Sequence, residues 1–208
     1  MERWEKLKRS VSQKLFEIGS IKFGEFVLSS GKISPIYIDL RIIPSFPNVF
    51  DLVAEAYIST IKRMEIPVDT IVGIPVGGLP IATLISYKLK KPLIYVRKEA
   101  KTHGLGKKIE GNLGKRQNLL IIDDVATTGK SILRAVNILR ENGCEPKNAL
   151  VLIDREQGAD KNLEENGIKL FSFIKITELL DILKQEGKLD QDSYDRIMKY
   201  IKMEKSSK

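Results

Sequence analysis

Apolar residues at helical spacing open the chain. Trp4, Leu7, Val11 and Leu15 recur every three or four positions, which predicts a helix over about Trp4–Ile18. Extended chain interrupted by a glycine turn is predicted next, with strand-like segments at Ile21–Leu28 and Pro35–Asp39 around the turn Ser29–Gly31.

Short apolar strands then alternate with helices. The predicted strands are Thr70–Ile74, Pro92–Val96, Asn118–Asp123, Ala149–Asp154 and Ile168–Ile174. The predicted helices are Pro47–Arg63, a segment ending near Leu89, Gly129–Asn142, Glu178–Gln185 and Gln191–Met203. Positions 119–122 and 150–153 are apolar at every residue, so both faces of these strands must be covered. The pattern predicts an α/β fold, a parallel sheet flanked by helices, whose ligands bind beyond the carboxyl ends of the strands.

Composition narrows the class of protein. With 208 residues, 42% of them apolar and 30% charged, the chain has room for one α/β domain and is neither disordered nor collagen-like. No apolar run reaches the roughly 18 residues of a membrane helix, and the charged start has no signal-peptide pattern. Cys144 is the only cysteine, so no internal disulfide is possible, and we expect a cytoplasmic location.

The net charge of +8 is concentrated in one segment. Between Arg97 and Arg116, seven basic residues stand against two glutamates, giving a net +5. The same segment contains Gly104, Gly106, Gly111 and Gly114, which favours a mobile loop that binds small anions over a rigid helix that reads nucleic acid. On charge alone, a solvated surface run is an equally good interpretation.

The segment from Leu119 to Ser131 carries the strongest chemical signal. Asp123 and Asp124 stand where a buried strand is predicted to end, and Thr127, Thr128 and Gly129 lead into a helix. The N–H groups of a helix start and the hydroxyls beside it bind phosphate, whereas two carboxylates repel phosphate and suit hydroxyls or a metal. A ligand with a phosphate at one end and a diol in the middle, such as a ribose 5-phosphate, satisfies both halves.

Three other interpretations of these residues are possible. Gly129-Lys130-Ser131 resembles the end of a Walker A loop, but that motif requires Gly at position 124, which is Asp. Gly104-x-Gly106 resembles a dinucleotide fingerprint, but the third glycine would fall at Ile109. A helix cap explains one of the two carboxylates but not both.

Four segments together resemble the orotate phosphoribosyltransferases, members of the type I phosphoribosyltransferase family. The strand, acidic pair and Thr/Gly-rich loop at 119–131 are similar to the family signature. Ser34–Arg41 resembles an N-terminal motif of these enzymes, Arg97–Gly104 their flexible catalytic loop, and Asp154–Ala159 their base-site motif. All four occur in family order between about Phe23 and Ala159.

The resemblance implies transfer of a phosphoribosyl group from 5-phosphoribosyl 1-pyrophosphate (PRPP) to orotate, in pyrimidine (UMP) biosynthesis. It implies Mg²⁺ as cofactor, carried by the substrate's pyrophosphate with no direct protein ligand. The implied catalytic residues are Lys101, His103 and Asp124. The implied PRPP-binding residues are Arg97, Lys98, Lys101, His103, Asp123, Asp124, Val125, Ala126, Thr127, Thr128, Gly129, Lys130 and Ser131. The implied orotate-binding residues are Thr127, Arg155 and Tyr37, although Tyr37 fits a core aromatic equally well.

The resemblance also implies a homodimer whose catalytic loop is shared between subunits. It divides the chain into N-terminal hood elements (1–45), a phosphoribosyltransferase core (46–175) and C-terminal helices (176–208), which form one functional domain. Gly73–Gly78, a strand-to-helix turn, would present backbone N–H groups to pyrophosphate. Two positions depart from the family: Ser29 stands where many members have Lys, and Thr102 where Asp is common.

Two rival functions remain to be distinguished. One is a phosphoribosyltransferase for a purine or for uracil, against which Arg155 and the Ser34–Arg41 motif argue. The other is a non-enzymatic regulator that senses PRPP and binds nucleic acid. Intact Lys101 and His103, and a balanced charge over 190–208, argue against that second function.

Overall fold

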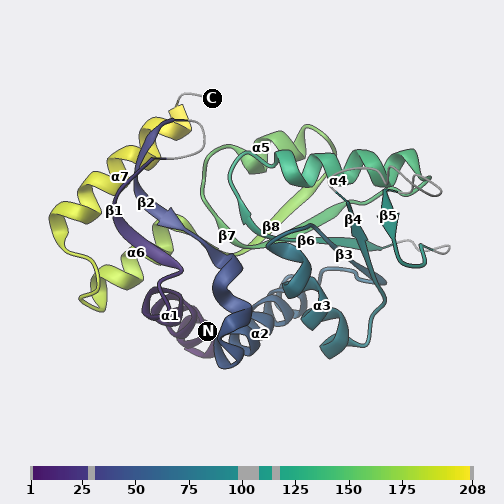
Figure 1. The fold of residues 1–208 in the computed structure, drawn as a ribbon, viewed down its shortest axis with the longest axis horizontal. Helices are drawn as coiled ribbons and strands as arrows, with labels where there is room; N and C mark the ends of the chain where they lie inside the picture. Colours follow the sequence, from purple (N-terminus) through teal and green to yellow (C-terminus); the bar gives the residue numbers. More distant parts are fainter. Residues whose placement is uncertain (1, 28–30, 98–107, 114–117, 207–208) are drawn as a thin grey trace.

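In its computed structural model, the protein is built around a six-stranded sheet (Figure 1). The structure describes residues 2–27, 31–97, 108–113 and 118–206. The sheet has the order β5-β4-β3-β6-β7-β8. Its strands are β3 (Thr70–Gly73), β4 (Leu93–Val96), β5 (Ile109–Glu110), β6 (Leu119–Ala126), β7 (Asn148–Asp154) and β8 (Lys169–Lys175). All neighbours pair in parallel except β4 and β5, which confirms the predicted α/β architecture.

Helices cover both faces of this sheet. The helices are α1 (Glu2–Glu17), α2 (Pro47–Arg63), α3 (Gly78–Leu89), α4 (Lys130–Glu141), α5 (Ala159–Glu164), α6 (Ile176–Gln185) and α7 (Gln191–Ser206). Leu120 and Ile122 point into a core shared with α1, α2, α3 and α6, whereas Leu119 and Ile121 point into a second core against α4 and α5. The run of apolar residues in β6 is therefore explained by burial on both faces.

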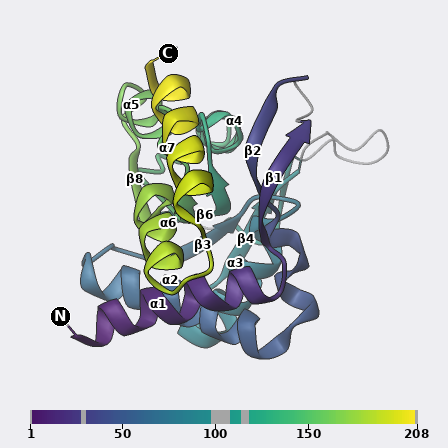
Figure 2. The ribbon, with the colours of Figure 1, turned by 90° about the vertical axis from the view of Figure 1, so that its left-hand side faces the viewer.

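An antiparallel hairpin of β1 (Ile21–Val27) and β2 (Ile33–Ile38) forms a small second sheet. It contacts α7, and an ion pair of 2.8 Å joins Lys32 to Glu204 of that helix. The hairpin and α7 stand at the same end of the molecule (Figures 1 and 2). No helix among the described residues is long and apolar enough to cross a membrane.

Several boundaries differ from the sequence prediction. β6 does not end at Asp123 but continues to Ala126, because its pairing with β7 runs on after its pairing with β3 has stopped at Ile122. The prediction also missed the two-residue strand β5, the six-residue helix α5 and a short 3-10 helix at Leu40–Ser45. Each is too short for hydrophobic periodicity to reveal it.

Candidate active site

The two aspartates lie on the part of β6 that extends beyond β3. Asp123 is only 7% exposed, and Asp124 is half-buried beside it. The main-chain N–H of Asp124 donates to Oδ1 of Asp123 at 3.0 Å, and the N–H of Val125 donates to Oδ1 of Asp124 at 2.9 Å. Each carboxylate is thus oriented by the backbone of the next residue, which fixes the pair locally.

This position is electrostatically unfavourable for two negative charges. Burial and the neighbouring charge of Asp124 raise the pKa of Asp123 well above its usual value. Burial also raises the pKa of Asp124, opposed by main-chain hydrogen bonds and by the charge of Arg41. Perturbed carboxyls at the carboxyl end of a central strand indicate a site built for a ligand that supplies hydrogen-bond donors or positive charge.

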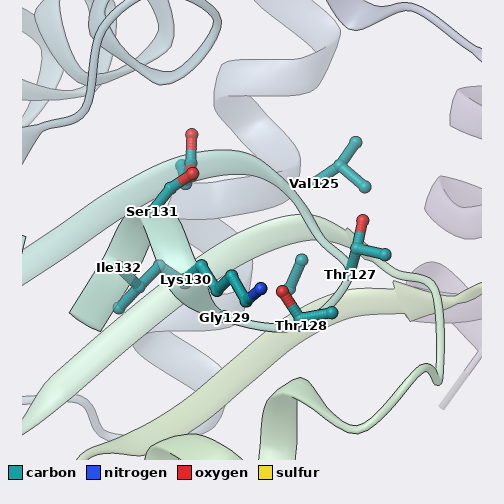
Figure 3. A pocket seen from close by; sticks show the side chains of 9 residues that line it. Val125, Thr127, Thr128, Gly129, Lys130, Ser131 and Ile132 are labelled. Carbon is teal, nitrogen blue, oxygen red and sulfur yellow. The ribbon is translucent and has the colours of Figure 1, made fainter. Parts of the chain in front are cut away.

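A small pocket follows directly along the chain (Figure 3). The pocket has a volume of about 90 Å³ and is lined by Asp123 and residues 125–132. Figure 3 shows the hydroxyls of Thr127, Thr128 and Ser131 and the amine of Lys130 around the loop. One water needs roughly 10–15 Å³ and whole-ligand pockets span roughly 300–1,000 Å³, so this space fits one small group such as a phosphate.

Gly129 makes the tight entry into α4 possible. Its φ of +76° lies in the left-handed region, and α4 begins at the next residue, Lys130. A Cβ at position 129 would also lie 3.0 Å from Cγ of Leu163 in α5. The loop is therefore held close to α5, with the start of α4 directed at the pocket, which is the arrangement that binds phosphate groups.

The turn after β3 packs against the aspartate pair. The N–H of Ile74 donates to the carbonyl of Ile122 at 3.1 Å, and α3 begins at Gly78. A Cβ on Gly77 would lie 2.0 Å from Oδ2 of Asp124, and one on Gly78 would lie 2.7 Å from the carbonyl oxygen of Ile122. The structure thus brings the predicted Gly73–Gly78 turn directly beside the acidic pair.

Arg155 approaches the same edge from the neighbouring strand. Its main-chain N–H donates to the carbonyl of Ala126 at 2.9 Å, which ties the end of β7 to the start of the Thr/Gly-rich loop. Burial lowers the pKa of Arg155, opposed by Tyr200 and Glu204 of α7. Among the described residues, no carboxylate forms an ion pair with this guanidinium. A half-buried guanidinium of this kind is chemically suited to bind an anion.

Its neighbour Glu156 is directed elsewhere. Oε2 of Glu156 accepts from the hydroxyl of Thr177 at 2.6 Å and from the main-chain N–H of Thr177 at 3.2 Å. Glu156 has a φ of +55°, and its N–H donates to Oδ1 of Asp154 at 2.8 Å. The turn after β7 is thus fixed by the side chains of Asp154 and Glu156.

Of the remaining predicted residues, the structure describes Tyr37 and Arg97 but not the others. Tyr37 is half-buried in β2, with its ring centroid 5.5 Å from that of Phe26 in the same hairpin, and its contact with orotate stays a prediction. Arg97 pairs with Glu110 of β5 at 2.9 Å, at the start of the basic segment. Lys98, Lys101 and His103 lie outside the described residues.

Two contributors to the site were missed at the sequence level. The hydroxyl of Tyr57 in α2 donates to the carbonyl of Asp123 at 2.7 Å, although its spacing marked it only as a core residue. Burial and both aspartates raise the pKa of Tyr57 well above its usual value, which keeps the hydroxyl a donor. The second missed contributor is Arg41, which forms an ion pair of 2.7 Å with Asp39 and whose charge lowers the pKa of Asp124. It lies in the Ser34–Arg41 motif but was not predicted as a site residue.

Comparison with known proteins identifies the family of the chain. A family model described as "Phosphoribosyl transferase domain" matches residues 42–179. The orotate phosphoribosyltransferase of Saccharolobus solfataricus is 42% identical over 187 residues, which cover 90% of this chain and 94% of that protein. The crystal structure of orotate phosphoribosyltransferase from Aeropyrum pernix superposes with a TM-score of 0.75 at 34% identity, covering 86% of this chain and 99% of that one. UMP synthase from Leishmania donovani gives a TM-score of 0.85 at 33% identity, covering 94% of this chain but 42% of that one.

Proposed function

The chain belongs to the orotate phosphoribosyltransferases of UMP biosynthesis, within the phosphoribosyltransferase family, and we propose how its residues share the reaction. The bond between C1 of the ribose and the pyrophosphate oxygen breaks, a bond from C1 to N1 of orotate forms, and the proton of N1 passes to the departing pyrophosphate or to solvent. Orotidine 5′-phosphate and pyrophosphate are the products. Positive charge develops on the sugar while negative charge leaves with pyrophosphate, so the protein must stabilise both.

The contact between the ends of β6 and β7 carries this proposal. The aspartate pair, the phosphate-sized pocket and Arg155 all lie within one connected edge, joined by the hydrogen bond from Arg155 to Ala126. The pocket at Val125–Ser131 holds the 5-phosphate through hydroxyls and the start of α4. The carboxylates of Asp123 and Asp124 accept hydrogen bonds from the ribose hydroxyls, which provides the donors that these buried groups need.

The leaving group and the base occupy the two flanks of the aspartate pair. The Gly73–Gly78 turn offers main-chain N–H groups to pyrophosphate, and Arg97, Lys98, Lys101 and His103 supply positive charge as it departs. Arg155 pairs with the orotate carboxylate or a ring carbonyl, and Thr127 lies between the phosphate pocket and the base. A stacking role for Tyr37 stays a prediction.

Mg²⁺ fits the donor set of this site. Carboxylates are hard oxygen ligands, and Mg²⁺ is commonly held by one or two of them together with substrate phosphates and water. The ion enters with the pyrophosphate of the substrate, so no residue is assigned as its direct ligand. When bound, it neutralises part of the pyrophosphate charge.

The assembly, the division of the chain and the location extend this proposal. The functional unit is a homodimer in which the loop of one subunit serves the site of the other. The hood (1–45), core (46–175) and C-terminal helices (176–208) act as one domain, supported by the hydrophobic core on one face of the sheet, to which α1, α2, α6 and α7 all contribute. A cytoplasmic location is supported by the single cysteine.

One assay tests the reaction. The purified chain is incubated with PRPP and orotate, with and without Mg²⁺, and orotidine 5′-phosphate and pyrophosphate are quantified. We expect equimolar products that require Mg²⁺, and no comparable turnover of uracil or hypoxanthine. Preferential use of another base, or binding of PRPP without turnover, would overturn the assignment.

A further inference from the structure

A buried hydroxyl contacts the main chain of the acidic pair from behind. Tyr57 is 0% exposed in α2, and its Oη donates to the carbonyl oxygen of Asp123 at 2.7 Å. The rest of the ring packs in the core, with Val53 and Ile61 on the same buried face of the helix. An apolar ring fills such a space equally well, so the hydroxyl requires its own explanation.

The hydroxyl acts on the peptide unit that joins the two aspartates. The carbonyl of this unit accepts from Tyr57, and its N–H, which belongs to Asp124, donates to Oδ1 of Asp123 at 3.0 Å. Both polar ends of one peptide plane are therefore held. Rotation of that plane would move the Asp124 N–H away from the Asp123 carboxylate and turn the two side chains relative to each other.

The partners on the other side of the pair reinforce this restraint. Gly77 lies against the carboxylate of Asp124, where a Cβ would come within 2.0 Å of Oδ2. Pairing with β3 ends at Ile122, so the Asp123–Asp124 peptide has β7 on one side and no β3 strand on the other. Tyr57 supplies, from α2, a restraint at the point where the sheet no longer encloses β6.

We propose that Tyr57 is a positioning residue for PRPP: its hydroxyl fixes the Asp123–Asp124 peptide so that both carboxylates face the ribose. The inference rests on the proposed function of the aspartates. Tyr57 itself touches no substrate. Its loss should weaken ligands held by the pair while sparing ligands held by Arg155.

Tyr57→Phe tests this role because it removes the hydroxyl and keeps the ring. The matched control is Thr60→Val, one turn along α2. Thr60 is also 0% exposed, and its hydroxyl donates to the carbonyl of Ala56 at 2.8 Å within the helix, away from β6. Each variant loses one buried hydroxyl from the same helix, and Tyr57→Phe also loses the contact of that hydroxyl with the main chain of Leu152 in β7. A general loss of stability is therefore expected in both variants, and only an effect on PRPP is expected to separate them.

We expect Tyr57→Phe to raise the KM for PRPP roughly two- to tenfold, the range that one net hydrogen bond spans. The KM for orotate should stay within the range set by Thr60→Val, which should change neither KM. An unchanged KM for PRPP in Tyr57→Phe, or equal rises in both variants, would overturn the positioning role. Asp124→Asn is assayed in parallel: if it binds PRPP normally, the proposed role of the pair fails and this inference fails with it.

A structure of the wild-type enzyme with PRPP bound provides a test that needs no variant. We expect Oη of Tyr57 to remain within hydrogen-bond distance of the Asp123 carbonyl while both carboxylates contact the ribose hydroxyls. A bound structure in which Tyr57 has released that carbonyl would overturn the inference. This measurement decides the matter if Tyr57→Phe does not fold.

Discussion

The carboxylate of Asp124 fills the position that a side chain on Gly77 would need: a Cβ built on Gly77 would lie 2.0 Å from Oδ2 of Asp124 and 2.5 Å from its Cγ. The backbone of Gly77 is ordinary, with φ −71° and ψ −41°, so alanine would be accepted there on conformational grounds. The absence of a side chain at position 77 is therefore required by the carboxylate and not by the turn.

Gly77→Ala should consequently weaken PRPP binding with little change in the fold. The added methyl must displace the Asp124 carboxylate, so we expect the KM for PRPP to rise tenfold or more, a loss of about 1.4 kcal/mol. Steady-state kinetics with each substrate varied would measure it. Gly143→Ala is the control, because a Cβ there meets nothing within 4 Å and only its φ of +77° is strained. If both variants behave alike, Gly77 has no special relationship with Asp124.

Asp123→Asn should stabilise the ligand-free protein while impairing PRPP binding. Burial and Asp124 raise the folded-state pKa of Asp123 above the unfolded value of about 3.9, so between these two pKa values the folded state binds more protons. Wild-type stability therefore falls as pH rises through that window, and asparagine removes this loss. We expect a higher Tm for the variant at neutral pH, where each ~1 kcal/mol corresponds to about 2–4 °C.

The difference in Tm between variant and wild type should shrink as pH is lowered, because the protonated aspartate is also neutral. Thermal unfolding without ligand across the acidic to neutral range would follow it. Asp51→Asn, which breaks a surface pair with Lys88, should change Tm little at any pH. A variant less stable than wild type at neutral pH would show that the Asp123 carboxylate is needed for folding.

The sequence predicted those parts of the fold that depend on local pattern. β6 and β7 carry apolar residues on successive positions because both faces are covered, and that signal lies within a few residues of chain. β5 forms only because Ile109 and Glu110 pair with Val96 and Tyr95 across the basic segment. A two-residue strand has no periodicity, so no pattern could have indicated it.

The site divides in the same way. The acidic pair and the Thr/Gly-rich loop after it are contiguous in sequence, so residue type and order were sufficient to predict that they lie together at one edge of the sheet. Tyr57 donates to a carbonyl 66 positions away, and its spacing in α2 is the same as that of a purely structural residue. Gly77 was expected to expose backbone N–H groups, but its contact with Asp124 depends on how β3 and β6 pair.

Arg155→Ala should damage orotate binding much more than PRPP binding. A hydrogen bond to a charged group is worth about 1.5–3 kcal/mol, so we expect the KM for orotate to rise roughly 10- to 150-fold. Burial disfavours the charged form of Arg155 and lowers its pKa, so we expect loss of the charge by itself to leave Tm little changed. Arg196→Ala, an exposed site on α7, is the control. Equal losses for both substrates would show that Arg155 maintains the structure of the site.

Lys101→Ala should lower kcat roughly 10²–10³-fold, the usual cost of removing one preorganised charge contact, and leave orotate binding intact. The segment from Arg97 to Arg116 carries a net +5, and we expect the charge of Lys101 to meet pyrophosphate mainly in the transition state. A stronger test addresses the shared site. If Lys101 serves the partner's site, each dimer of one Lys101→Ala and one Asp124→Asn subunit contains one site with both defects and one with neither.

Mixing the two inactive variants should therefore restore activity. Random reassembly of equal amounts of the two variants places half of all active sites in mixed dimers. One of the two sites in each mixed dimer is intact, so about a quarter of wild-type activity should return. Each variant dissociated and reassembled alone must stay inactive, and wild-type chains treated identically must recover. If the loop served its own subunit, every site in a mixed dimer would carry one defect and none would be active. Mixtures that stay inactive while wild-type chains recover would therefore contradict the shared site and the dimer proposed from it.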